Sequence, residues 1–204
     1  MNAPAYPITV FWSPEDSAWV AAACERLNNI AQLNPLDNEQ EEQLMTIQAG
    51  DEIPDTQLWR MTKDGPKAIS SAEVLGTGKV VLFAVPGAFT PTCSDHHLPG
   101  FVLRADEIRA KGVDTIACLS VNDPFVMGAW GRARGAEDHV VMLSDGNGEF
   151  TRAVDLEMDG SGIGLGKRSR RYAAILEDGV VRSIFVEHGP GVEVSSAEAV
   201  LAAL

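Results

Sequence analysis

Two short apolar runs, KVVLFAV at residues 79–85 and TIACLSV at residues 115–121, constrain the fold more strongly than any other feature of the sequence. Neither run shows the polar alternation of a strand with one solvated face, which is typical of strands buried on both faces. Between them, apolar residues recur at helical spacing from Leu98 to Ile108. Pro99 falls inside this helix and is expected to kink it after its first turn or so. The pattern predicts buried strands with a helix packed against them.

The same alternation of strand and helix continues from Met45 to the end of the chain. The further elements predicted are, in order, a helix from Asn122-Asp123-Pro124 through Trp130, a strand at 140–143, a turn at 145–148, a hairpin around Asp178-Gly179, and a terminal helix that starts at 195–198. Strands joined by helices, followed by a hairpin, give a mixed sheet that is covered on both faces. We therefore expect the α/β class, as a thioredoxin-like three-layer α/β/α sandwich with a mixed central sheet.

The chain is expected to divide near residue 45. Residues 1–44 hold seven acidic residues against one basic residue, Arg26. Within them, Ile8–Trp12 is a candidate strand and Ser17–Leu27 a candidate amphipathic helix, and the polar stretch that follows is typical of a linker. We interpret residues 1–44 as a short N-terminal extension with an acidic linker, and residues 45–204 as the α/β domain.

Charge and composition exclude several classes of partner. The 204-residue chain has a net charge of −13, which repels nucleic acid and anionic membranes, so we expect neither as a partner. No apolar run approaches the roughly 20 residues that a membrane span needs. The N-terminus lacks the features of a signal or transit peptide, and the three cysteines do not form a secreted disulfide framework. On these grounds we expect a cytoplasmic protein.

Cys93 stands alone in the segment PGAFTPTCSDHHLPG, with Thr90 where a C-x-x-C motif would place a second cysteine. The segment follows the strand at 79–85 and opens a helix, so the free backbone amides of the first turn stabilise an anion. A thiolate there is a nucleophile at the carboxyl end of a strand, where open α/β sheets place their chemistry. A buried structural cysteine is the alternative, but a loop rich in Pro, Gly and Thr favours a reactive one.

PGAFTPTCSDHHLPGF resembles the active-site segment of the peroxiredoxins, and in particular of the type II (peroxiredoxin-5-like) subgroup. Four further segments resemble that subgroup in order and spacing: SVNDPFVMGAWG, LSDGNGEFT, GKRSRRYAAILEDGVV and the C-terminal EHGPGVEVSSAEAVLAAL. The resemblance covers about Met45 to Leu204. It implies a thiol-dependent peroxidase that reduces hydrogen peroxide and alkyl hydroperoxides through a cysteine sulfenic acid.

The resemblance also implies catalytic roles. Cys93 would be the peroxidatic cysteine, Thr90 would orient the peroxide through its hydroxyl, and Pro86 would shield the sulfur. The arginine just before the aromatic residue of RRY is Arg171, whose fixed positive charge would stabilise the developing oxyanion. Its neighbour Arg170 is expected to be a solvated charge.

Three more residues are assigned to the pocket. His97 matches the histidine of the family's HLPG segment, where a structural hydrogen bond is the alternative to proton transfer. The segment GSGIGLGK fits neither the P-loop nor the dinucleotide-binding pattern, so we interpret it as a loop whose Ile163 and Leu165 help to wall the peroxide pocket. Adjacent histidines, as at His96-His97, point apart on a helix and make a poor metal pair. We expect neither a metal nor a cofactor.

Cys118 lies 25 residues after Cys93, where several type II peroxiredoxins carry a cysteine that is described as resolving. Its position in the middle of a predicted buried strand favours an inert thiol instead. We therefore expect an external reductant, either glutathione with glutaredoxin or thioredoxin, and we assign no role to Cys24.

Two other functions are alternatives to turnover. A non-catalytic redox sensor or holdase could use the same cysteine, but an intact set of Thr90, Cys93 and Arg171 favours an enzyme, because a sensor needs no arginine for a transition state. A cysteine hydrolase would need a histidine base with an orienting partner, and no such constellation stands out. The resemblance also implies a homodimer, with Phe125 of the NDPF segment as an exposed apolar contact.

Overall fold

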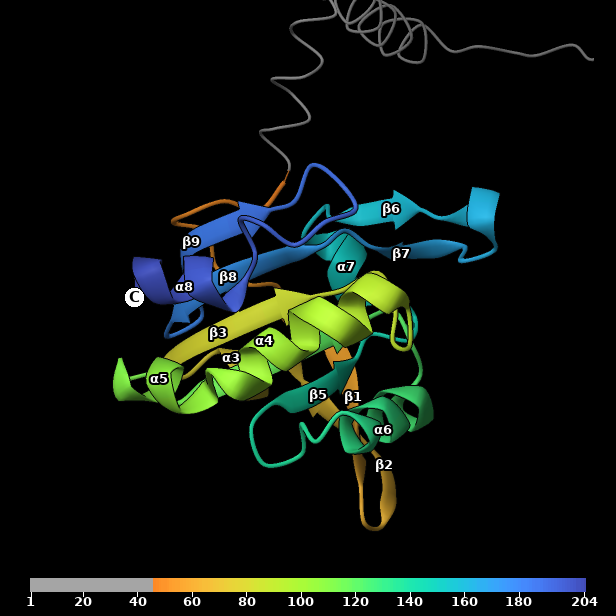
Figure 1. Cartoon of the computed structure of the whole chain (residues 1–204), viewed down its shortest axis with the longest axis horizontal. Helices are drawn as coiled ribbons and strands as arrows, with labels where there is room; N and C mark the ends of the chain where they lie inside the picture. Colours follow the sequence, from red (N-terminus) through yellow and green to blue (C-terminus); the bar gives the residue numbers. More distant parts are fainter. Residues whose placement is uncertain (1–45) are drawn as a thin grey trace, which may run out of the picture. The chain divides into compact units, whose positions relative to one another are not determined.

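A seven-stranded mixed sheet forms the centre of the computed structural model, which describes residues 46–204 (Figure 1). The strands are β1 (Gln57–Thr62), β2 (Gly65–Ser70), β3 (Lys79–Ala84), β4 (Thr115–Ser120), β5 (Val141–Ser144), β6 (Glu157–Asp159), β7 (Lys167–Ser169), β8 (Tyr172–Glu177) and β9 (Val180–Val186). The large sheet has the order β2-β1-β5-β4-β3-β8-β9, and β6 and β7 form a separate pair. Strands β3, β4 and β5 run parallel, and the other neighbouring strands run antiparallel.

Helices cover both faces of this sheet (Figure 1). They are α3 (Ser71–Leu75), the π-helical turn η1 (Cys93–His97), α4 (Leu98–Leu103), α5 (Ala105–Ala110), α6 (Pro124–Ala133), α7 (Glu149–Ala153), the 3₁₀ turn η2 (Ser161–Ile163) and α8 (Ala197–Ala203). The predicted three-layer α/β/α architecture with a mixed sheet is therefore confirmed.

The two apolar runs behave as strands that are buried on both sides. In β3, Val81 and Phe83 belong to the apolar cluster under α4, α5, α6 and α8, whereas Val80 and Leu82 belong to the cluster on the opposite face. Successive side chains of a strand point to opposite faces of the sheet. A run without polar residues is therefore apolar on both faces, and both are buried. Burial of each such side chain contributes about 1.5–3 kcal/mol. These strands thus hold both layers of the sandwich together.

The helix after Cys93 differs in detail from the prediction. Pro99 was expected to kink the helix. Immediately before this proline, the structure has a π-helical turn in which the Leu98 amide donates to the Cys93 carbonyl. A second break, at Arg104, separates α4 from α5 and was not predicted, because no proline or glycine marks that position.

The hairpin of β8 and β9 confirms the signal at Asp178-Gly179. Both turn residues have positive φ, 48° for Asp178 and 80° for Gly179, as the favoured two-residue hairpin turn requires. The β1–β2 hairpin and the short β6–β7 pair were not predicted, because their sequences are half-exposed and show no apolar run. The predicted strand Ile8–Trp12 and helix Ser17–Leu27 lie outside the described residues.

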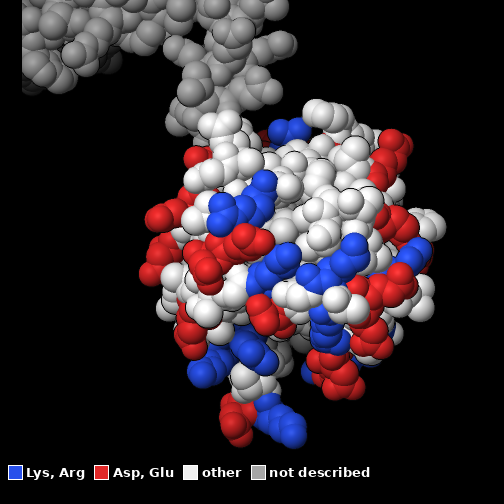
Figure 2. Space-filling model, turned by 90° about the vertical axis from the view of Figure 1, so that its left-hand side faces the viewer, with Lys and Arg blue, Asp and Glu red and all other residues white. Residues whose placement is uncertain are grey.

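Ion pairs connect neighbouring elements on the surface. Arg104 pairs with Glu107 and with Glu198 of α8, and Glu177 pairs with Lys79 and Arg182. Figure 2 shows basic and acidic side chains interspersed on the face toward the viewer. Such exposed pairs contribute little each, about 0–1 kcal/mol. Among the helices of residues 46–204, none is long and apolar enough to cross a membrane.

Candidate active site

The loop between β3 and the helix of Cys93 is held by the end of β4. The Ser120 hydroxyl donates a hydrogen bond to the Val85 carbonyl at 3.0 Å, and the Asn122 side-chain oxygen accepts one from the Ala88 amide at 2.9 Å. Because β3 and β4 are parallel, their carboxyl ends meet at the same edge of the sheet. The loop that leads to Cys93 is thus fixed by its neighbouring strand.

Cys93 lies in the first turn of the helix, as predicted. The helix begins at Pro91, and the Ser94 amide closes its first turn by donating to the Thr90 carbonyl at 3.0 Å. Only 1% of the Cys93 surface is exposed. The side chain of Ser94 accepts a hydrogen bond from the Trp130 indole at 3.0 Å, which anchors this turn to α6. The sulfur is therefore held rigidly at the start of a helix, where backbone amides favour an anion.

Arg171 places two donors on the Cys93 sulfur. Its Nη1 and Nη2 atoms each lie 3.4 Å from Sγ. Arg171 directly precedes β8, and the pairing of Tyr172 with Ala84 sets it beside the carboxyl end of β3. Arg171 is 6% exposed, and within residues 46–204 no carboxylate lies within 4.0 Å of its guanidinium. A buried cation is costly unless an anion compensates it, and the group that both terminal nitrogens contact here is the Cys93 sulfur.

His97 lies beside Arg171 and lines a different depression from the one that Arg171 lines. Its Nδ1 atom is 3.1 Å from Arg171 Nη1, and its Nε2 atom is 2.9 Å from the Ser195 carbonyl oxygen. The ring packs against Phe83 and Phe101. Burial lowers the pKa of His97 from 6.5 to about 4, with a smaller contribution from the Arg171 charge, and the hydrogen bond to Ser195 and the charge of Glu187 oppose this shift only in part. The imidazole is therefore neutral at physiological pH.

Glu187 completes the buried polar group. Its Oε1 atom accepts hydrogen bonds from the Glu193 amide at 2.6 Å, the Ser195 amide at 2.9 Å and the Ser195 hydroxyl at 2.8 Å. Burial by itself raises the pKa of the Glu187 carboxyl, but these hydrogen bonds outweigh burial and lower it. Neither Glu187 nor Ser195 was predicted from the sequence. Their segment, EHGPGVEVSS, carries only turn residues and a helix-capping serine as signals.

A depression with a volume of about 540 Å³ opens beside these groups. Five of the predicted residues line it: Pro86, Thr90, Ile163, Leu165 and Arg171. Met158, Pro91 and Pro190 add apolar surface, and Glu187 and Arg170 also line it. Neither Cys93 nor His97 lines it, since both are about 1% exposed, but both contact Arg171, which does. Arg170, expected to be a solvated charge, is half-buried at this wall.

Thr90 holds the loop in its present state. Its hydroxyl donates to the Gly87 carbonyl at 2.8 Å, and the residue lines the depression. The hydroxyl can rotate about its C–O bond, so it can instead donate to a bound oxygen.

Cys118 lies in the centre of β4 and is fully buried. It pairs in register with Phe83 on one side and Met142 on the other. Burial raises the pKa of its thiol well above the ordinary value, and the nearby Cys93 raises it further. Cys93 and Cys118 are both free thiols in the structure.

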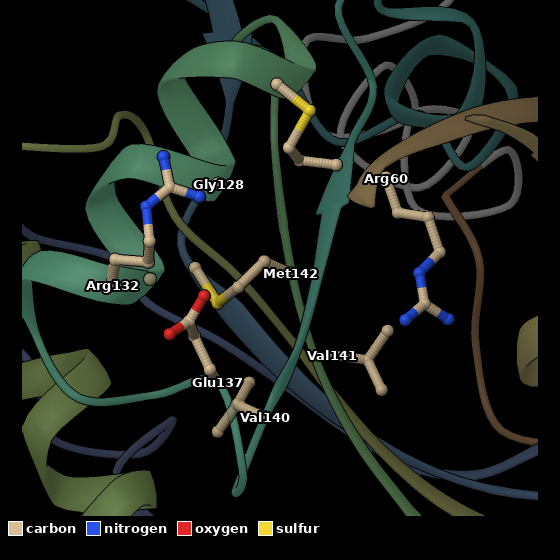
Figure 3. Close-up of a pocket in the computed structure, with 9 residues that line it drawn as sticks. Arg60, Gly128, Arg132, Glu137, Val140, Val141 and Met142 are labelled. Carbon is tan, nitrogen blue, oxygen red and sulfur yellow. The ribbon is translucent and has the colours of Figure 1, made fainter. Parts of the chain in front are cut away.

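A second depression, of about 200 Å³, lies between β1, α6 and β5 (Figure 3). Arg60, Arg132 and Glu137 line it together with apolar residues of β5, and none of the residues predicted for chemistry takes part. In the part of the chain that the structure describes, no group of three or more His, Cys, Asp or Glu side chains is arranged to hold a metal ion. The depression beside Cys93 is therefore the candidate active site.

The chain is similar to known proteins over most of the part that the structure describes. The family model described as Redoxin matches residues 48–201. The chain is 54% identical to Peroxiredoxin-2E-2, chloroplastic, of Oryza sativa subsp. japonica, over 78% of this chain and 73% of that protein. It is 49% identical to Peroxiredoxin-2E, chloroplastic, of Arabidopsis thaliana, over 78% of this chain and 70% of that protein. Among solved structures it is similar to reduced Prx3 in complex with H2O2 from Vibrio vulnificus, with 52% identity, a TM-score of 0.74, and coverage of 78% of this chain and 99% of that chain.

The comparisons contradict the expectation of a cytoplasmic protein. The Oryza and Arabidopsis relatives at 54% and 49% identity are both named as chloroplastic proteins. The expectation rested on the lack of recognisable targeting features in residues 1–44, which lie outside the described residues. The lack of a recognisable signal carries no positive information about the compartment, and the inference drawn from it was wrong.

The lowered pKa of His97 predicts an acid-dependent loss of stability. An unfolded histidine titrates near 6.5 and His97 near 4, so on acidification the unfolded state binds this proton first. The free energy of unfolding should therefore fall as the pH is lowered from about 6.5 to about 4, by at most about 3 kcal/mol from this group. In His97→Asn, which cannot be protonated there, urea denaturation across this range should show a shallower fall.

His96→Asn is the matched control, because it makes the same change at an exposed position. It should follow the wild-type pH dependence. If His97→Asn lost stability as steeply as the wild type, His97 would not be the buried neutral group described above.

Proposed function

The chain belongs to the peroxiredoxin family and is a peroxidase, and from this premise we propose that Cys93 is its peroxidatic thiol, which reduces hydrogen peroxide and alkyl hydroperoxides through a sulfenic acid. The observation that carries the proposal is the Arg171 guanidinium, buried and with both terminal nitrogens 3.4 Å from the Cys93 sulfur. This cation both stabilises a thiolate and is in place for the negative charge that develops on a departing oxygen. The motif segments around Cys93 and Arg171 favour the type II subgroup.

The reaction follows from the positions of these groups. The Cys93 thiolate attacks the terminal oxygen of the peroxide, the S–O bond forms, and the O–O bond breaks. Sulfur is oxidised to the sulfenic acid, and the leaving hydroxide or alkoxide takes up a proton to become water or an alcohol. The Arg171 guanidinium and the Thr90 hydroxyl supply hydrogen bonds to the peroxide oxygens. Both residues line the depression through which the substrate reaches the sulfur.

The lining of the depression supports alkyl hydroperoxides as substrates beside hydrogen peroxide. Ile163, Leu165, Met158 and Pro190 provide an apolar wall next to the polar end formed by Thr90 and Arg171. An alkyl chain gains from contact with such a wall, whereas hydrogen peroxide needs only the polar end.

The sulfenic acid is reduced by an external thiol, which we assign to glutathione with glutaredoxin or to thioredoxin. Cys118 is the alternative within the chain. It is fully buried in β4, and because burial raises the pKa of its thiol it is a poor nucleophile. Cys118 is therefore assigned a structural role.

Arg171→Ala should keep the fold but lower the second-order rate constant for peroxide by about 10²–10³-fold. Loss of one preorganised donor to a developing oxyanion costs about 2.7–4 kcal/mol of barrier. Stopped-flow fluorescence with hydrogen peroxide measures the rate, and circular dichroism checks the fold. Arg182→Ala, which removes a surface arginine that pairs with Glu177, is the control and should react like the wild type. Equal rates in Arg171→Ala and wild type would remove the arginine from the mechanism.

A panel of reductants tests both turnover and the role of Cys118. Wild type and Cys118→Ser should each consume many equivalents of peroxide with the glutathione and glutaredoxin pair or with thioredoxin, at rates within about a factor of two. A single equivalent consumed by wild type with every reductant would indicate a sensor rather than an enzyme. Turnover that is lost in Cys118→Ser alone would make Cys118 the resolving cysteine.

We also propose a homodimer that forms through the NDPF segment and does not need residues 1–44. Phe125, at the start of α6, is 59% exposed and offers an apolar contact. A chain that starts at Met45 should fold, dimerise and retain peroxidase activity, because the three layers and the assigned catalytic residues all lie after that position. Light scattering at micromolar concentration measures the mass.

Phe125→Asp should shift this shortened chain to the monomer, whereas Leu103→Asp, at a position 81% exposed on α4, should not. Aggregation or inactivity of the chain that starts at Met45 would show that the extension is part of the fold. A monomeric wild type, or dissociation by Leu103→Asp alone, would refute the proposed contact.

A further inference from the structure

A line of buried hydrogen bonds leads from the C-terminal loop to the reactive sulfur. It runs from Glu187 to Ser195, from Ser195 to His97, and from His97 to Arg171, whose guanidinium contacts Cys93. We call Glu187, Ser195 and His97 the His97 relay. Each of its members is at least nine-tenths buried, at 9%, 0% and 1% exposure. The relay is therefore largely shielded from solvent, and Glu187 reaches it only where it lines the depression.

We propose that the His97 relay positions Arg171 on Cys93, and that the loop from Glu187 to Ser195 thereby sets the reactivity of the sulfur. The inference rests on the proposed function, since it concerns the same arginine and the same thiolate. None of the three relay residues contacts the sulfur, so they act as positioning residues through Arg171.

The hydrogen-bonding partners of His97 fix its tautomer. The Ser195 carbonyl oxygen can only accept, so Nε2 must carry the hydrogen. The Arg171 guanidinium can only donate, so Nδ1 must present its lone pair. A single neutral form of the ring satisfies both partners at once. The Nδ1 lone pair then holds Nη1 in the orientation from which it also reaches the sulfur.

Glu187 and Ser195 hold the acceptor that selects this tautomer. One oxygen of Glu187 accepts three hydrogen bonds from Glu193 and Ser195, and the Glu187 amide donates to the Arg171 carbonyl at 2.9 Å. The loop is thereby closed onto the strand that begins after Arg171. If the carboxylate oxygen is removed, the Ser195 carbonyl is no longer fixed opposite Nε2. The ring is then no longer held between two partners, so it can turn away from Arg171 and take either tautomer.

The charges around His97 support the neutral ring. Arg171 faces Nδ1, and Glu187 lies one hydrogen bond beyond Ser195 on the other side. Burial and the arginine lower the pKa of His97, while the Ser195 carbonyl and Glu187 raise it, and the balance leaves it near 4. A protonated ring would turn an N–H toward the guanidinium and remove the acceptor.

Two substitutions of His97 separate the relay from packing. His97→Asn keeps an oxygen near the position of Nδ1, whereas His97→Gln places its amide near Nε2 and leaves nothing near Nδ1. Both lose the same ring contacts with Phe83 and Phe101. Mass spectrometry measures the rate at which iodoacetamide alkylates Cys93 at pH 7. We expect this rate to stay within about 3-fold of wild type in His97→Asn and to fall at least about 10-fold in His97→Gln. Equal rates in the two variants, or a faster Gln variant, would overturn the proposal.

A second pair tests the loop. Glu187→Gln retains the accepting oxygen and Glu187→Met does not, at similar size. Nitrogen-15 NMR of the His97 ring should show the Nε2–H tautomer in wild type and in Glu187→Gln, and a mixture of the two tautomers in Glu187→Met. Alkylation of Cys93 should be slower in Glu187→Met than in the other two proteins. Protonated Nδ1 in the wild type, or an unchanged tautomer in Glu187→Met, would refute the relay even if the His97 variants did not fold.

Alkylation needs no peroxide, so it tests the relay separately from the proposed function. A wild type that failed to turn over peroxide would contradict the peroxidase mechanism, while the difference between the Asn and Gln variants would still decide the relay.

Discussion

A buried positive charge on Arg171 is the constraint on which the rest of the site depends. Arg171 is 6% exposed, and no carboxylate lies within 4.0 Å of it among residues 46–204, so its charge is costly unless an anion compensates it. The fold sets the Cys93 sulfur against this charge by ending β3 beside the arginine and starting the helix of Cys93 there. On its other side lies His97, which is neutral mainly because it is buried, and the Arg171 charge adds to this effect. The sulfur and the imidazole are thus both arranged around one cation.

Much of the sandwich could be predicted because apolar pattern and burial agree at particular residues. Val81 and Phe83 face one layer and Val80 and Leu82 the other, so the apolar run itself identifies a central strand. The β1–β2 hairpin could not be found in this way. Its strands are half-exposed, and Leu58 is their one buried residue, so no apolar run marks them.

The residues of the candidate site also divide into those that a sequence pattern indicates and those that it does not. Cys93, Thr90 and Pro86 lie in one short segment, and Arg171 stands in a motif of its own, so the sequence could predict them. Glu187 and Ser195 could not be predicted, since their contacts with the site depend on a loop that returns from β9 to the helix of Cys93. Their residue types are common in surface turns, and only the three-dimensional path of that loop gives them a role. The predicted cytoplasmic location was wrong, because the lack of a recognisable targeting signal is not evidence for a compartment.

The alternation of side chains along β8 has a consequence for how such a site can vary. Ala173 and Ile175 face the layer that contains Cys93, and Arg171 has the same parity one step before the strand. Shifting β8 by one residue against β3 would turn either Arg170 or Tyr172 toward the sulfur in its place. The register of β8 against β3 therefore decides which side chain lies beside the Cys93 sulfur. An insertion in the hairpin turn at Asp178-Gly179, at the far end of β8, would remove Arg171 from the sulfur if β8 slid to absorb it.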